Sequence, residues 1–72
     1  VTIKLFGPFR RERFSAQSRQ YPQGTTVEEV IDDLNLSRQL LGIILINGIH
    51  AEQRKILQEG DELSLLPLLE GG

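Results

Sequence analysis

The residues best suited to chemistry are the last two, Gly71 and Gly72. Glycine has no Cβ, so two glycines in a row can pass through a narrow channel in a partner that any larger residue would block. The reactive group is then the terminal carboxylate of Gly72. The chain has no Cys and no Met, and therefore contains no sulfur. If the protein handles sulfur, the sulfur must be attached at that carboxylate.

The segment before the two glycines favours a functional end over an inert one. Glycine is also common in termini that carry no function, but here the pair follows a strand-like segment and Pro67. Residues 62–66 alternate between apolar and other side chains, which predicts a last core strand. We therefore expect a folded domain over residues 1–66 and a flexible arm over residues 67–72 that presents the carboxylate.

The rest of the chain offers little chemistry. One His and no Cys cannot provide a four-ligand zinc site, and His50 has no nucleophile or metal set to act with. No nucleophile with its base and no cofactor loop is recognisable, so we expect no bound metal or cofactor and no self-sufficient enzyme. No apolar run approaches the roughly 20 residues that span a bilayer, and no signal peptide opens the sequence. These observations predict a cytoplasmic protein without a membrane partner.

Charge is distributed unevenly along the chain. Residues 1–24 hold five basic side chains and one acidic one, whereas residues 25–72 hold three basic and nine acidic ones. The acidic half carries the arm, which suits docking against a basic partner surface. Nucleic-acid binding needs a sustained basic face, so we expect no nucleic-acid partner. The basic residues between Arg10 and Arg13 are interpreted as a solvated loop.

The first element that must position the arm is a hairpin. Residues 2–6 alternate, with Ile3 and Leu5 on one face, as in a half-buried strand. Residues 13–21 alternate weakly and are expected to form the second strand. Residues 7–12 then form the connecting loop.

A helix follows, with clear start and stop signals. Thr25 as N-cap and Glu28 three residues later predict a capping box, in which each side chain binds the other residue's free backbone N–H. Asn35 is expected to end the helix, because asparagine tolerates the left-handed conformation. One apolar stripe at helical spacing faces the sheet, made of Val27, Val30, Ile31 and Leu34.

The second half of the chain reads as further strands. Residues 43–46 are apolar throughout, which predicts a central strand covered on both faces. Asn47 and Gly48 both accept positive φ and predict a two-residue hairpin turn, followed by a short return strand over residues 49–51.

This order of elements predicts an α+β roll of the ββαββ kind, with a mixed sheet and one main helix. One helix covers only one face of the sheet. Phe6, Leu66 and one side of the 43–46 run point toward the other face. An apolar patch left uncovered there would mark a partner-binding surface.

Several short motifs resemble those of a known family. They are a first strand ending in Leu-Phe-Gly, a helix start Gly-Thr-Thr-Val-Glu-Glu, a hairpin Ile-Leu-Ile-Asn-Gly, a turn Gly-Asp-Glu and an end Leu-Leu-Pro-x-x-x-Gly-Gly. In this order and spacing they resemble the ubiquitin-like β-grasp sulfur carriers of the MoaD/ThiS type. That family includes the small subunit of molybdopterin synthase and the thiamine-pathway carrier. The resemblance covers nearly the whole chain.

The resemblance implies a mechanism. In this family an adenylyltransferase of the ubiquitin-activating type uses ATP to adenylate the last glycine, and sulfide from a donor displaces AMP to leave a thiocarboxylate. Activation is needed because an α-carboxyl, with a pKa of about 3.3 to 3.7, is an anion at neutral pH and a poor electrophile. A sulfur-accepting synthase subunit is the implied second partner.

The family's functional positions carry over by motif. Gly72 matches the adenylated and sulfurated residue, and Gly71 the slim residue behind it. The stem that relatives pack against their partners matches Leu66, Pro67, Leu68 and Leu69, with Glu70 grouped among the partner-facing residues rather than the catalytic ones. Many molybdopterin-type carriers have aromatics and two consecutive prolines at this stem, so the pathway stays open, with molybdopterin favoured.

Other classes of function stay open beside the sulfur carrier. Acyl transfer to a lysine would make the protein a modifier joined through Gly72, and the sequence cannot separate this fate from transfer to sulfide. A carrier for the thiamine or a cysteine pathway is a further alternative. The last is a ubiquitin-fold interaction module with an inert tail.

Overall fold

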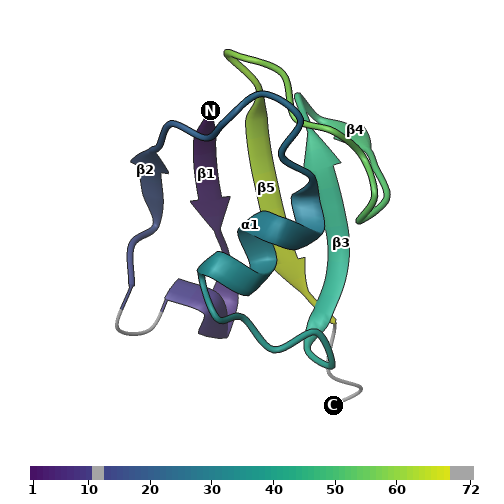
Figure 1. The fold of residues 1–72 in the computed structure, drawn as a ribbon. Helices are drawn as coiled ribbons and strands as arrows, with labels where there is room; N and C mark the ends of the chain where they lie inside the picture. The colour runs from purple at the N-terminus through teal and green to yellow at the C-terminus, as the bar shows by residue number, and fades with distance from the viewer. Residues whose placement is uncertain (11–12, 69–72) are drawn as a thin grey trace.

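The structure, a computed structural model, describes residues 1–10 and 13–68. It contains a five-stranded sheet in the order β2-β1-β5-β3-β4, with β1 and β5 parallel and the other neighbours antiparallel. One α-helix lies across one face of this sheet (Figure 1). The elements are β1 Thr2–Leu5, the 3₁₀ helix η1 Gly7–Arg10, β2 Ala16–Ser18, α1 Val27–Asp33, β3 Leu41–Ile46, β4 Ile49–His50 and β5 Glu62–Pro67. The predicted α+β roll, with a mixed sheet and one main helix, is confirmed.

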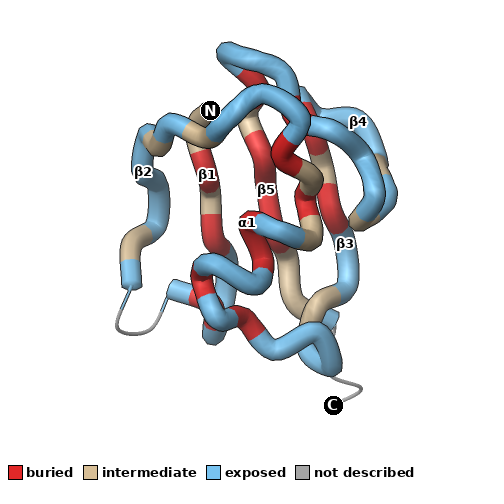
Figure 2. Tube along the Cα trace, in the orientation of Figure 1, coloured by how far each residue is buried: buried red, intermediate tan, exposed pale blue. Residues whose placement is uncertain are grey.

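The hydrophobic core lies between α1 and the sheet, where Figure 2 shows the buried residues of both facing one another. The helix contributes Val27, Val30 and Ile31, all fully buried. The strands contribute every second residue, as the pleat requires, and these are Ile3, Leu5, Ile44, Ile46, Leu63 and Leu65. The alternation read from the sequence for the first and last strands therefore has the correct phase.

The capping box lies one residue later than predicted. Thr26, not Thr25, is the N-cap: its Oγ1 accepts from the Glu29 backbone N–H at 3.4 Å, and Glu29 Oε1 accepts from the Thr26 N–H at 3.1 Å. Thr25 is instead buried, and its hydroxyl donates to the Pro22 carbonyl at 2.7 Å. The pairing of Thr25 with Glu28 was therefore wrong, because the preceding loop engages Thr25. The predicted stop is confirmed at Asn35, with φ 55°.

The first hairpin differs from the prediction in both its loop and its second strand. The strand expected over residues 13–21 is reduced to β2, in which all three residues are exposed. No apolar face is present there to extend the pairing. Within the expected loop, η1 forms and buries Phe9 against the core. A buried aromatic therefore organises the part of this loop that the structure describes.

The strand over residues 43–46 is not covered on both faces, so that prediction was wrong. β5 is the central strand, and β3 is followed by the short edge strand β4. Ile44 and Ile46 face α1 and are buried, whereas Ile43 is 41% exposed. The hairpin turn is confirmed by φ values of 54° at Asn47 and 81° at Gly48, although the return strand is shorter than expected.

Among the residues that the structure describes, no helix combines the length and the apolar character that crossing a membrane would require.

Candidate functional site

The face of the sheet opposite α1, here called the outer face, carries an apolar row beside the end of β5. Leu66 pairs with Ile43 across β5 and β3. Phe6 follows Leu5, the residue that pairs with Leu65, so Phe6 lies on the other side of Leu66. Phe6 and Ile43 are each 41% exposed, and Leu66 is half-buried between them. These three residues, named the outer-face row, lie on the side that the alternation predicts.

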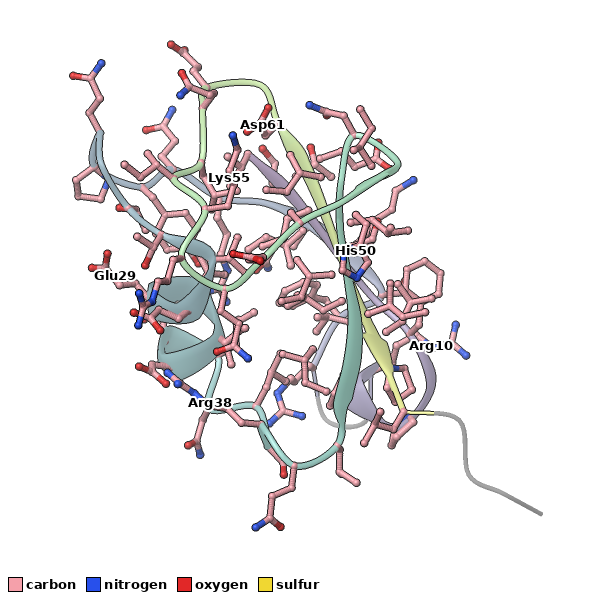
Figure 3. All side chains as sticks on the ribbon, turned by 90° about the vertical axis from the view of Figure 1, so that its right-hand side faces the viewer. Arg10, Glu29, Arg38, His50, Lys55 and Asp61 are labelled. Carbon is pink, nitrogen blue, oxygen red and sulfur yellow. The ribbon has the colours of Figure 1, made fainter. Side chains whose placement is uncertain are left out.

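The outer face is more polar away from this row, although it still includes the half-buried Leu45. The next residues across the sheet are Lys4, Ser64, Leu45 and His50, joined by the strand register. Lys4 Nζ forms an ion pair with Glu62 Oε1 at 2.8 Å. The apolar character of the outer face is therefore concentrated at the end of the sheet where β5 finishes. Figure 3 shows the sheet from the side, with Glu29 and Arg38 to one side of it and Arg10 to the other.

The arm begins attached to the sheet. β5 runs to Pro67, one residue further than the predicted strand, and Pro67 pairs with Leu41. The Leu68 N–H then donates to the Leu40 carbonyl at 2.6 Å. Leu68 and Leu40 are 55% and 45% exposed, which adds two apolar side chains near the outer-face row.

The remaining predicted site residues, Leu69, Glu70, Gly71 and Gly72, lie outside the described residues. Phe6, Leu66, Pro67 and Leu68 are thus the predicted positions that the structure places, and it brings them together at one end of the sheet. Three residues beside the start of the arm were not predicted as site residues, namely Leu40, Gly7 and Gly42. Gly42 stands at the edge of an apolar strand, where an isolated glycine signals a bulge or a close backbone approach.

Other chemically capable groups lie away from the arm. Within residues 1–10 and 13–68, no set of three His, Cys, Asp or Glu side chains is arranged to hold a metal ion. Burial raises the pKa of Tyr21 above its ordinary value of 10.0, and its hydroxyl donates to Asp33 Oδ2 at 3.3 Å. The surface has two hollows. One, of about 720 Å³, is lined by residues 20–25 and 56–59. The other, of about 660 Å³, is lined by residues around the Asn47 turn. Both lie at the end of the sheet opposite the arm.

A comparison with protein families identifies the chain. The model of the ThiS family matches residues 3–72, and the protein belongs to this family. The match includes the Gly71-Gly72 end. A comparison with curated protein sequences finds no match.

Several solved structures share this fold. SAMP1 from Haloferax volcanii is 23% identical, with a TM-score of 0.74 over 99% of this chain and 97% of that one. A putative molybdopterin converting factor, subunit 1, from Pyrococcus furiosus is 19% identical, with a TM-score of 0.77 over 94% of this chain and 95% of the other. A second structure of H. volcanii small archaeal modifier protein 1 has 21% identity and a TM-score of 0.76 over 94% and 95%.

These similarities confirm the ubiquitin-like β-grasp fold. The chain is therefore a protein of the ThiS family with a ubiquitin-like β-grasp fold.

Proposed function

We propose that this protein is a sulfur carrier in cofactor biosynthesis, and we favour the molybdopterin pathway. The observation that supports this most directly is that the family match runs through residue 72 and so includes the two final glycines. In the proposed role the domain provides recognition, and Gly72 provides the reactive atom. The protein is then a carrier or small synthase subunit that depends on partner enzymes for every chemical step.

The proposed reaction has two steps at the Gly72 carboxylate. A carboxylate oxygen first attacks the α-phosphate of ATP and releases pyrophosphate, which converts a poor electrophile into an acyl adenylate. A sulfide-level sulfur from a donor then attacks the acyl carbon, and AMP leaves. The product is a thiocarboxylate, in which one oxygen has been replaced by one sulfur. ATP is bound by the activating partner and not by this chain.

We infer that the outer-face row is where these partners dock. Phe6, Ile43 and Leu66 form an apolar surface on the side of the sheet that α1 leaves uncovered, and exposed apolar patches commonly mark protein interfaces. The row lies beside Pro67 and Leu68, so a partner that holds it also meets the start of the arm.

A second candidate function is attachment to lysine through Gly72. The ground for this candidate is that one structure sharing this fold is H. volcanii small archaeal modifier protein 1. Both functions share the adenylation step. They differ only in the second nucleophile, which is sulfide for a carrier and a lysine amine for a modifier.

Intact-mass spectrometry tests the proposal. Incubation with an activating enzyme, ATP and sulfide should add the mass difference of one sulfur replacing one oxygen, and fragmentation should locate it at Gly72. Deleting Gly72, or extending the chain beyond it, should abolish this gain and leave the melting curve unchanged. Gly71→Val should reduce the gain nearly as much, because a β-branched residue widens and stiffens the arm.

Each other result selects a different function. Products joined to lysine in the absence of sulfide would favour the modifier. If a variant with a blocked C-terminus keeps full activity in the proposed pathway, no reaction at the Gly72 carboxylate is needed. That result would exclude both the carrier and the modifier and would favour the ubiquitin-fold interaction module.

A further inference from the structure

The start of the arm lies against a bulge in β3. Leu41 pairs with Pro67 and Ile43 pairs with Leu66, so two steps along β3 correspond to one step along β5. Gly42 is the extra residue. A bulge of this kind bends its strand and changes the direction of the neighbouring chain. Here the neighbouring chain is the segment from which the arm departs.

Gly42 has no room for a side chain. A Cβ at this position would lie 2.9 Å from the Cα and N of Leu68 and 2.9 Å from the Pro67 carbonyl oxygen. Contacts this short are essentially absent from real proteins. All three are main-chain atoms, so no change of rotamer can relieve them. Any residue other than glycine at position 42 therefore forces the main chain to shift where β3 meets Pro67 and Leu68.

A second glycine contacts the same segment from the other neighbouring strand. Gly7 follows β1, which flanks β5 on the side opposite β3. A Cβ at Gly7 would lie 3.0 Å from Pro67 Cγ, and its φ of 59° lies in the left-handed region that side chains disfavour. The hydrogen bond from Leu68 to the Leu40 carbonyl adds a third constraint. The last described residues are thus fixed from both sides.

We propose that Gly42 and Gly7 are positioning residues that set where, and in which direction, the arm leaves the domain. This inference rests on the proposed function, since it concerns delivery of Gly72 to a partner. Gly72 lies four positions after Leu68 in the sequence, and at about 3.5 Å per residue a segment of that length spans at most roughly 14 Å. A partner docked on the outer-face row can place its active site only within that reach. Moving the origin of so short an arm misplaces the carboxylate without changing any side chain of the outer-face row.

The experiment compares Gly42→Ala with the wild type and with Gly60→Ala. Gly60, like Gly7 but unlike Gly42, has a positive φ, 85°, and a Cβ there meets no atom within 4 Å, so its substitution adds backbone strain far from the arm. Amide hydrogen exchange of Leu68 measures whether the arm base is held, with no partner present. ATP–pyrophosphate exchange with the activating enzyme then gives kcat and the KM for the carrier.

The two readouts have definite expected results. In Gly42→Ala the Leu68 amide should exchange about tenfold faster or more. Adenylation kcat should fall by roughly 100-fold, as a displacement of about 1 Å near a reacting group can cause, with the KM unchanged. Gly60→Ala should match the wild type in both. Gly7→Ala should change both in the same direction but less, because the Pro67 ring can adjust, and it provides the test if Gly42→Ala does not fold.

Opposite results would overturn the inference at identifiable steps. An unchanged Leu68 exchange rate in the two arm variants would show that these glycines do not hold the arm base. Faster exchange with unchanged kcat would show that the exit direction does not affect delivery. If the wild type itself is never adenylated, the proposed function fails and the positioning role falls with it, while the exchange data still show whether Gly42 fixes Leu68.

Discussion

Arg13 Nε donates to the Leu34 carbonyl at 3.2 Å, and Arg13 Nη2 donates to the neighbouring Asn35 carbonyl at 3.1 Å. These carbonyls end α1 and have no intrahelical donor, and a cation is favourable at this end of the helix dipole. The same guanidinium contacts the Phe9 carbonyl at 3.5 Å. Arg13 therefore joins the first hairpin to the end of the helix, whereas the sequence analysis assigned Arg10–Arg13 to a solvated loop.

Replacing Arg13 should destabilise the fold. Arg13→Met keeps most of the side-chain length but removes the charge and the donors, and we expect a loss of about 1 kcal/mol in the free energy of unfolding. Arg10→Met, at an exposed position near by, is the matched control and should change the free energy by less than about 0.5 kcal/mol. Urea unfolding measures both. Equal effects for the two variants would remove the helix-capping role of Arg13.

Val30→Asp should unfold the domain. Val30 is fully buried between α1 and the sheet, so a carboxylate there is desolvated without a partner and costs several kcal/mol. A domain of this size has little more stability than that to lose. Gln39→Asp introduces the same group at an exposed position and should retain the wild-type melting curve. An unchanged melting curve for Val30→Asp would contradict the burial of this helix face.

Tyr21 gives the stability a dependence on alkaline pH. Burial raises its pKa in the folded protein above 10.0, so the folded state retains the phenol proton more strongly than the unfolded state. The corresponding stability is fully present below pH 10.0 and is lost as the pH rises through the folded-state pKa. Tyr21 is the only tyrosine in the chain. Tyrosinate absorbance therefore follows it directly.

The absorbance midpoint should lie above pH 10.0 in the native protein and near 10.0 in urea. Tyr21→Phe should lose less stability between neutral pH and pH 11 than the wild type, because it has no phenol to ionise. A native midpoint at or below that of the denatured chain would contradict the effect of burial.

The sequence predicted the features of this fold that local chemistry determines. The phase of the first and last strands follows from period-two alternation, and the Asn47-Gly48 turn follows from tolerance of positive φ. The capping box was misplaced because Thr25 and Thr26 each have a glutamate three residues later. The choice between them depends on the tertiary hydrogen bond from Thr25 to Pro22, which no local pattern contains.

The candidate site was predictable only in part. Outward placement of Phe6 and Leu66 follows from strand alternation, whereas the roles assigned to Gly71 and Gly72 stay predictions. The contact of Gly42 with Leu68 joins residues 26 positions apart through a bulge. Its discovery requires the register of β3 against β5. The exposure of Ile43 also depends on the sheet, because residues 43–46 are all apolar and no polar residue among them shows which strand face is exposed.

Leu66→Lys tests whether the outer-face row binds the partners. Leu66 lies between Phe6 and Ile43 on the uncovered side of the sheet, so a lysine can extend into solvent and the domain should stay folded. Binding should weaken at least about tenfold, equivalent to roughly 1.4 kcal/mol, because apolar contact is lost and an ammonium must be desolvated in the complex.

His50→Lys, at an exposed position farther from the arm on the same face, is the control and should bind normally. Calorimetry with the activating enzyme and with the sulfur-accepting subunit gives the affinities, and circular dichroism gives the fold. A folded Leu66→Lys variant with wild-type affinity for both partners would exclude the outer-face row as the docking surface and leave recognition to the arm alone.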